Sequence, residues 1–199
     1  MRKIKPDLKE RAKKELGLAG KKIVLLQGYF RRSKNFERVV RLFPKIADNV
    51  DDALLLIASA ARRPEDIAYR DEFLEFVAKS RATDKIKVLP GPFSDERYDF
   101  ILSSADVVVL PYLKGAQSGI MAHCLAFSKP MVVSSDIYAL VDSIQKTRSG
   151  LVAGTDAELT GAIIKILTDK NLAKEFSDYA RRYIEEHLSW QIISSKHMG

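Results

Sequence analysis

Short apolar runs alternate with amphipathic segments along nearly the whole chain of 199 residues. The runs are rich in Ile, Leu and Val and are apolar on both faces, as expected for buried strands of a parallel sheet. The segments between them repeat apolar residues every three or four positions, which is typical of helices that cover a sheet. This alternation predicts an α/β fold, with a doubly wound, Rossmann-like parallel sheet of six strands and helices on both faces.

The pattern fixes the expected elements. Strands are predicted at residues 22–27, 53–59, 86–89, 107–110, 131–134 and 150–152. Helices are predicted at residues 7–16, 35–47, 66–81, 95–103, after Gly119, and at 137–145, 156–168 and 171–187, with a further piece after Ser189. Because no shift in composition and no low-complexity stretch marks a linker, residues 1–199 are expected to form a single domain.

The composition narrows the class of protein. No apolar run approaches the roughly 20 residues of a membrane span, and no apolar core of a signal peptide follows the basic N-terminus. Cys124 is the only cysteine, so neither an internal disulfide nor a cysteine metal cluster can form. No Asp-x-Asp motif is present. We therefore expect a cytoplasmic protein with no metal and no other cofactor.

The net charge of +7 is concentrated in two places. One is the N-terminal helix, whose lysines and arginines are interpreted as a solvated face. The other is the loop Arg31-Arg32-Ser33-Lys34 at the end of the first strand, where ligands bind in parallel sheets. Nucleic acid is not an expected partner, because aromatic residues are not interleaved with the basic ones.

The segment Gly28 to Asn35 carries the first candidate chemistry. A glycine there allows the backbone to turn and a ligand to approach closely, while Arg31 and Lys34 can reach a diphosphate as a fork and as a point charge. The segment has neither the three glycines of the dinucleotide fingerprint nor the Gly-Lys-Ser of a P-loop. Taken alone, it also fits solvated loop charges.

A second candidate loop begins at Ser118-Gly119-Ile120, between the strand at 107–110 and an apolar helix. The free backbone N–H groups at the start of a helix can hold a phosphate. Both loops follow parallel strands, so they are expected at the same edge of the sheet. Together they predict a site for a phosphorylated ligand.

Three segments together resemble the C-terminal half of group 1 (family 4) glycosyltransferases, which have the two-domain GT-B fold. Gly28 and Lys34 have that family's spacing of a strand-end glycine and a lysine six residues later. Residues 105–111 match its Ala-Asp-Val-x-Val-x-Pro segment, and residues 118–133 resemble its glycine turn, helix and following strand. The resemblance covers roughly residues 8–195.

The resemblance implies the donor-binding domain of a retaining glycosyltransferase, such as a mannosyltransferase of polysaccharide biosynthesis. It would move a sugar from a UDP- or GDP-sugar to an acceptor such as a glycan or a lipid carrier. The family's N-terminal acceptor domain would have to come from a longer chain or from a partner subunit. Alone, this domain is expected to be inactive, and peripheral membrane association is expected of the full enzyme. The residues implied to bind the donor diphosphate are Gly28, Arg31, Lys34, Ser118, Gly119 and Ile120.

The chain also departs from the family. Many members have arginine where this chain has Tyr29, and the family's two donor-site glutamates correspond here to Gly115 and His123. A neutral imidazole can bind a ribose hydroxyl, so His123 is assigned to the ribose, with packing against the sheet as the alternative. The remaining assignments are Gly115, Ala116 and Gln117 facing the sugar, and Gly91 and Phe93 bordering the base. Phe93 also fits a plug of the core, and Gln117 an exposed loop.

Two other functions remain open at this point. A sugar-nucleotide epimerase with a related two-domain fold would release free nucleoside diphosphate without an acceptor. A non-catalytic module would use the basic surface to bind RNA, DNA or anionic lipid. Its binding would fall steeply with salt and would not depend on the nucleoside.

Overall fold

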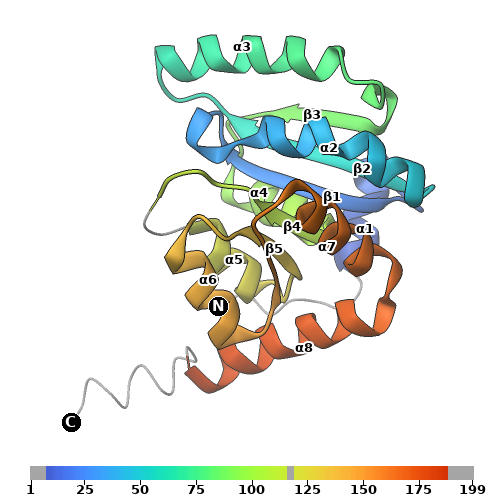
Figure 1. The fold of residues 1–199 in the computed structure, drawn as a ribbon, viewed down its shortest axis with the longest axis vertical. Coiled ribbons are helices and arrows are strands. Elements are labelled where there is room, and N and C mark those ends of the chain that lie inside the picture. The colour runs from blue at the N-terminus through green and yellow to red at the C-terminus, as the bar shows by residue number, and fades with distance from the viewer. Residues whose placement is uncertain (1–7, 116–118, 188–199) are drawn as a thin grey trace.

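A six-stranded sheet organises the part of the chain that the computed structural model describes, residues 8–115 and 119–187 (Figure 1). All its neighbouring strands are parallel, in the order β3-β2-β1-β4-β5-β6. The predicted doubly wound α/β sheet is therefore confirmed. The strands are β1 (Lys22–Tyr29), β2 (Ala53–Ala60), β3 (Ile86–Pro90), β4 (Val107–Leu110), β5 (Met131–Ser134) and β6 (Gly150–Ala153).

Helices cover both faces of this sheet (Figure 1). On one face α2 packs against α3 and α7, and on the other α1 packs against α4 and α5 against α8. Two short 3₁₀ turns, η1 (Arg32–Lys34) and η2 (Thr83–Lys85), precede α2 and β3. The helices are α1 (Leu8–Glu15), α2 (Phe36–Asn49), α3 (Pro64–Ala78), α4 (Asp95–Ser104), α5 (Gly119–Ala126), α6 (Tyr138–Thr147), α7 (Asp156–Thr168) and α8 (Lys170–His187).

The strand order reverses beside β1. Strands β2 and β3 lie on one side of β1, and β4 to β6 on the other. The loops that leave the carboxyl ends of β1 and β4 consequently lead to helices on opposite faces, which opens a crevice between them. The core surrounds the same strand, because the side chains from Ile23 to Leu26 are fully buried between the two helical layers.

Helix α3 begins earlier than the predicted residue 66. Pro64 stands at its start, where the missing N–H costs nothing. The Asp66 carboxylate accepts hydrogen bonds from the backbone N–H groups of Arg62 and Arg63, both at 3.2 Å. This cap fixes the path of the chain from β2 into the helix. The helical piece predicted after Ser189 lies outside the described residues.

Asp106 joins the amino ends of the central strands to helix α1. Its Oδ2 accepts the N–H of Ile23 at 2.6 Å and lies 2.8 Å from Lys13 Nζ, while Oδ1 lies 2.5 Å from Lys9 Nζ. Burial of the carboxyl opposes ionisation, but the two ammonium groups outweigh it, and the pKa of Asp106 is lowered. Part of the basic N-terminal helix is thus structural, in contrast to the solvated face expected from the sequence.

Replacing Asp106 with Asn tests this anchor, because the amide retains an acceptor for Ile23 but removes the charge. We expect the free energy of unfolding to fall by about 2 kcal/mol, since two partly buried ammonium groups lose their partner. Chemical denaturation measures the change. The control is Glu15→Gln, which breaks the exposed pair with Arg11 and should cost less than about 1 kcal/mol. Equal effects of the two variants would contradict the anchoring role.

A third lysine binds at the same edge, inside the fold. Lys129, just before β5, is buried and donates hydrogen bonds to the carbonyls of Ser103 at 2.6 Å and Ala105 at 3.1 Å, at the end of α4. Burial, and next the charge of Lys9, lower the pKa of Lys129 to about 7, against the attraction of the Asp106 carboxylate. The ammonium group thus titrates near neutral pH in the folded chain.

The stability of the protein should therefore rise with pH between about pH 7 and pH 8.5. In this window the unfolded chain keeps a proton on Lys129 that the folded chain releases. At higher pH the buried thiol of Cys124, whose pKa is raised to about 12, has the opposite effect. Denaturant titrations at several pH values measure the slope, with Lys129→Met as the control that lacks it. An identical slope in both proteins would exclude Lys129 as its source.

Candidate functional site

A cleft of about 580 Å³ opens at the carboxyl edge of the sheet, beside the point where the strand order reverses. Its walls come from the loops after β1, β2 and β3, from α4, and from the first turns of α5. Much of the predicted site meets here, although its members lie far apart in the sequence. The predicted residues that line the cleft are Gly28, Arg31, Lys34, Phe93, Gly119, Ile120 and His123.

Lys34 stands at the end of η1, where the loop from β1 turns into α2. Its Nζ lies 3.6 Å from the centre of the Tyr112 ring, which follows the end of β4. Burial, together with the positive charge of Arg31, lowers the pKa of Lys34. Gly28 begins this turn with a φ of +149°, a conformation that side chains disfavour. The loop thus brings two cations together behind a glycine.

The two arginines of the loop point in different directions. Arg31 lines the cleft, with its Nε 3.7 Å from Asp66 Oδ1 and its guanidinium carbon 5.5 Å from the centre of the Tyr29 ring. Arg32 instead pairs with Glu72 on α3 and stacks on Tyr69. Of this pair, Arg31 is therefore the one available to a ligand in the cleft.

The opposite wall of the cleft is the first turn of α5. Gly119 and Ile120 line the cleft, and the N–H groups of a first helical turn have no partners within the helix. They present a partial positive charge, which attracts anions. Ser118, the third residue predicted here, lies outside the described residues. The α5 terminus and Lys34 therefore provide positive charge on both sides of one space.

His123 follows one turn later on α5. Its imidazole is half exposed, its Nδ1 lies 3.7 Å from Asp99 Oδ1, and its ring meets Tyr98 edge-on with centroids 5.3 Å apart. The side chain faces the cleft, in contrast to the alternative of a histidine packed against the sheet. An imidazole in this position can exchange hydrogen bonds with a hydroxyl group.

The residues expected around the base and the sugar are more dispersed. Phe93 lines the cleft and also packs against the core. Gly91 is not a lining residue, and a Cβ there would lie 2.8 Å from that of Ala60, so close packing requires the glycine. Gly115 is exposed, with a φ of +144°, and is not a lining residue either. Ala116 and Gln117 lie outside the described residues.

Several polar residues of the cleft were missed from the sequence. They include Asp95, Tyr98 and Arg62 together with Gln27, which lies on β1 and is almost fully buried. Gln27 Nε2 donates to the carbonyl of Tyr98 at 3.1 Å, whereas its Oε1 has no hydrogen-bond partner among the described residues. A single polar side chain at the end of an apolar strand was the available signal for Gln27.

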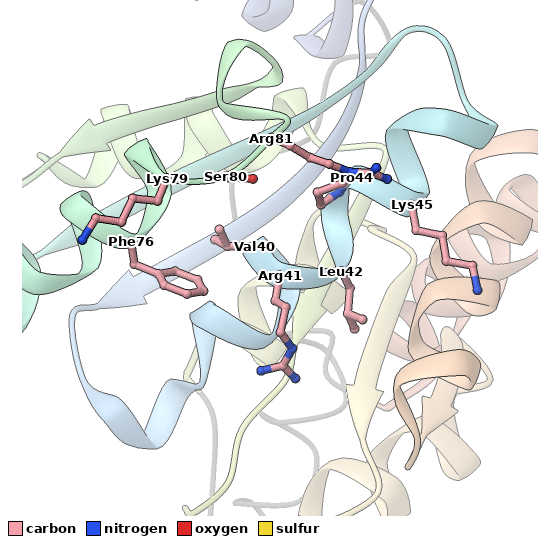
Figure 2. A pocket seen from close by; sticks show the side chains of 9 residues that line it. All are labelled: Val40, Arg41, Leu42, Pro44, Lys45, Phe76, Lys79, Ser80 and Arg81. Atoms are coloured by element: carbon pink, nitrogen blue, oxygen red, sulfur yellow. The ribbon is translucent and has the colours of Figure 1, made fainter.

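A second hollow, of about 490 Å³, lies between α2 and α3 (Figure 2). Apolar side chains such as Leu42 and Phe76 line it, and basic ones surround it. Two of these cations are engaged, since Arg41 bonds to Asp156 at 3.2 Å and Arg81 to Asp48 at 2.7 Å. None of the predicted site residues lines this hollow, so the cleft at the carboxyl edge is the candidate site.

Metal ligands and membrane spans were also sought. Within residues 8–115 and 119–187, no three His, Cys, Asp or Glu side chains are grouped so that they could hold a metal ion. Across the same residues, each helix is too short or too polar to cross a bilayer.

Comparison with known proteins identifies relatives of this chain. The family model described as glycosyl transferases group 1 matches residues 9–183. An uncharacterized glycosyltransferase of Methanocaldococcus jannaschii is 22% identical over 177 residues, which are 88% of this chain and 43% of that protein. The chain thus spans less than half the length of this curated relative.

Solved structures share the fold. Sucrose-phosphate synthase of Thermosynechococcus elongatus superimposes with a TM-score of 0.79 at 23% identity, over 94% of this chain and 46% of that one. HepE of Anabaena, solved with UDP and glucose, superimposes with a TM-score of 0.79 at 12% identity, over 98% of this chain and 52% of that one. WaaG, a glycosyltransferase involved in lipopolysaccharide biosynthesis, superimposes with a TM-score of 0.79 at 15% identity, over 97% of this chain and 50% of that one.

The family match includes every described residue that lines the cleft, from Gln27 to His123. The match and the fold agree with the resemblance found in the sequence. The chain belongs to the group 1 glycosyl transferases and has the fold of the C-terminal domain of GT-B enzymes.

Proposed function

We propose that the cleft binds the diphosphate of a nucleotide-sugar donor, and that the chain is the donor-binding domain of a retaining glycosyltransferase. The observation that carries this proposal is the positive charge on both sides of the cleft, from Lys34 on one wall and from the start of α5 on the other. A diphosphate between them would meet an ammonium group, a guanidinium group and free backbone N–H groups. The structures of HepE solved with UDP and with UDP-glucose support a ligand of this class.

The chemistry follows from the charge of the leaving group. As the bond between sugar and phosphate breaks, negative charge develops on the departing nucleoside diphosphate. Lys34, Arg31 and the N–H groups of Gly119 and Ile120 stabilise that charge, and they do so without reorganisation because the fold already holds them in place. His123 binds the ribose. As the phosphate leaves, the acceptor hydroxyl oxygen forms the new bond to the sugar and its proton passes to the departing phosphate, so this step uses no protein base. The donor is a UDP- or GDP-sugar.

The acceptor belongs to the rest of the enzyme. The chain spans about half of the solved relatives, and a second domain facing the carboxyl edge would complete the cleft and bind a glycan or a lipid carrier. In its absence water reaches the cleft from that side, so electrostatic stabilisation of the leaving group is screened. Donor binding by this chain alone is therefore weak, and transfer is slow or absent.

Thermal unfolding with UDP, GDP, ADP and inorganic pyrophosphate at matched salt tests the proposal. One nucleoside diphosphate should raise the melting temperature selectively, by several degrees at about 100 times its dissociation constant. Lys34→Ala should weaken binding of that ligand about 10-fold or more, because it loses a charge-assisted hydrogen bond. Binding of the corresponding nucleoside should not change.

Arg32→Ala is the matched control, since its guanidinium pairs with Glu72 outside the cleft. Like an Arg31 variant, it removes one positive charge from this loop. It should change the affinity for the nucleoside diphosphate by no more than about twofold. Small, equal shifts with every polyanion that disappear in salt would instead mean a non-specific basic patch. That result would exclude a donor site.

The role of His123 can be separated from that of the cations. His123→Ala should reduce the preference of the protein for the ribose over the deoxyribose form of the bound nucleotide, because an imidazole no longer meets the hydroxyl. A loss of about 1 kcal/mol in this preference is expected for one hydrogen bond. Competition between the two nucleotides measures it, and His123→Gln should restore part of it. An unchanged preference in His123→Ala would exclude the ribose role.

A further inference from the structure

Two arginines from different loops reach the same aromatic ring. Tyr29, the last residue of β1, is paired in register with Ala60, the last residue of β2. Arg31 and Arg62 each follow two residues later, so the parallel pairing carries both to the same place. Their guanidinium carbons lie 5.5 Å and 4.8 Å from the centre of the Tyr29 ring, within the range of cation–π attraction.

The neighbouring arginines are engaged elsewhere. Arg32 pairs with Glu72, and Arg63 Nη1 lies 3.5 Å from Glu65 Oε1, both on α3. The exposed side chain of Arg62 has no ion pair within residues 8–115 and 119–187, and it lines the cleft. Two of the four arginines therefore face a ligand, and the other two are neutralised on the surface.

Asp66 fixes the two loops relative to each other. It is buried, its Oδ2 accepts the backbone N–H groups of Arg62 and Arg63, and its Oδ1 lies 3.7 Å from Arg31 Nε. One carboxylate thus restrains the backbone of one arginine and the side chain of the other. Among the residues that the structure describes, the cations that line the cleft are Arg31, Lys34 and Arg62, and the one lining carboxylate is that of Asp95. The cleft therefore has an excess of positive charge.

Support by an aromatic ring differs from support by a carboxylate. A guanidinium group stacked on a ring is held by its face, so the N–H groups at its edge remain free to donate. It also keeps its full charge. N–H groups that stay free in this way can donate bidentate hydrogen bonds to phosphate oxygens.

We propose that Arg62 is a further binding residue for the donor diphosphate, and that Tyr29 is the positioning residue that holds Arg31 and Arg62 toward it. This inference rests on the proposed function of the cleft. It assigns a role to the loop after β2 in addition to those after β1 and β4. It also gives the aromatic residue next to Gly28 a purpose, since a smaller side chain would remove the ring that both guanidinium groups contact and would leave Arg31 held by Asp66 alone.

Calorimetric titration of the full chain with inorganic pyrophosphate and with UDP tests the role of Arg62. Pyrophosphate serves as the probe that does not depend on the base. We expect Arg62→Ala to weaken the binding of both ligands about 10-fold, because hydrogen bonds to a charged group are lost. Arg63→Ala, which removes the same charge from the next position, should stay within about twofold. Equal effects of the two variants would overturn the assignment.

Tyr29 is tested through its ring. Tyr29→Phe keeps the ring and should bind pyrophosphate like the wild type, whereas Tyr29→Leu should weaken it several-fold. Arg62→Ala should then cost less in the Tyr29→Leu background than in the wild type, because the two residues act as a unit. Melting temperatures of the free variants show whether each one folds. Weakening by Tyr29→Phe equal to that by Tyr29→Leu, or additive effects of the two changes, would overturn the positioning role.

The outcomes also separate this inference from the function on which it rests. If the wild type binds neither pyrophosphate nor any nucleoside diphosphate, both are wrong. If the wild type binds and Lys34→Ala weakens that binding while Arg62→Ala behaves like Arg63→Ala, only the inference about Arg62 is wrong. A larger loss for Arg62→Ala than for Arg63→Ala supports both.

Discussion

The parallel pairing of β1 with β2 on one side and β4 on the other is the constraint on which the rest of the structure depends. Parallel strands end at the same edge, so residues far apart in sequence must meet there. Because the strand order also reverses at β1, the loops from β1 and β4 lead to opposite faces and leave room between them. Position at a strand end, rather than any single residue type, creates the cleft.

Positive charge is compensated to different extents at the two edges of the sheet. At the amino edge, the ammonium groups of Lys9 and Lys13 meet the carboxylate of Asp106, and Lys129 is held by backbone carbonyls. Charge there is compensated and contributes to the fold. At the carboxyl edge, Lys34 lies over the ring of Tyr112 and two arginines lie over that of Tyr29. The rings orient these cations without adding a counter-charge. Arg31 also lies 3.7 Å from the Asp66 carboxylate, so the charge left for a ligand comes chiefly from Lys34 and Arg62.

Much of the fold could be predicted from the sequence, because short apolar runs such as residues 23–26, repeated between amphipathic segments, are typical of buried strands. The start of α3 could not be predicted, since it depends on the Asp66 side chain and two backbone N–H groups. Gly28, Lys34 and Gly119 could be placed near the cleft because they belong to the segments at the carboxyl ends of β1 and β4. Arg62 did not stand out, since its position depends on the register between β1 and β2, which one sequence does not reveal.

Local demands also explain the sites that the sequence misplaced relative to the cleft. Gly91 is required by contact with Ala60, and a pattern of glycines does not distinguish such packing from the approach of a ligand. For His123 the sequence left two positions open, the ribose site and packing against the sheet, and its half-exposed ring faces the cleft. Which face of a short helix a residue occupies depends on the neighbouring helix, here α4 with Tyr98.

The unsatisfied oxygen of Gln27 has a consequence for hydration. Its amide nitrogen is already engaged by Tyr98, so the side chain cannot turn to hide the oxygen without breaking that bond. Leaving such an acceptor without a partner costs about 1–3 kcal/mol. A water molecule or a ligand hydroxyl that reached this oxygen would donate to it and recover part of that cost, whereas a phosphate oxygen only accepts and would not. The wall at β1 therefore suits a hydroxyl-bearing part of a ligand, while the cations of the cleft suit its phosphates.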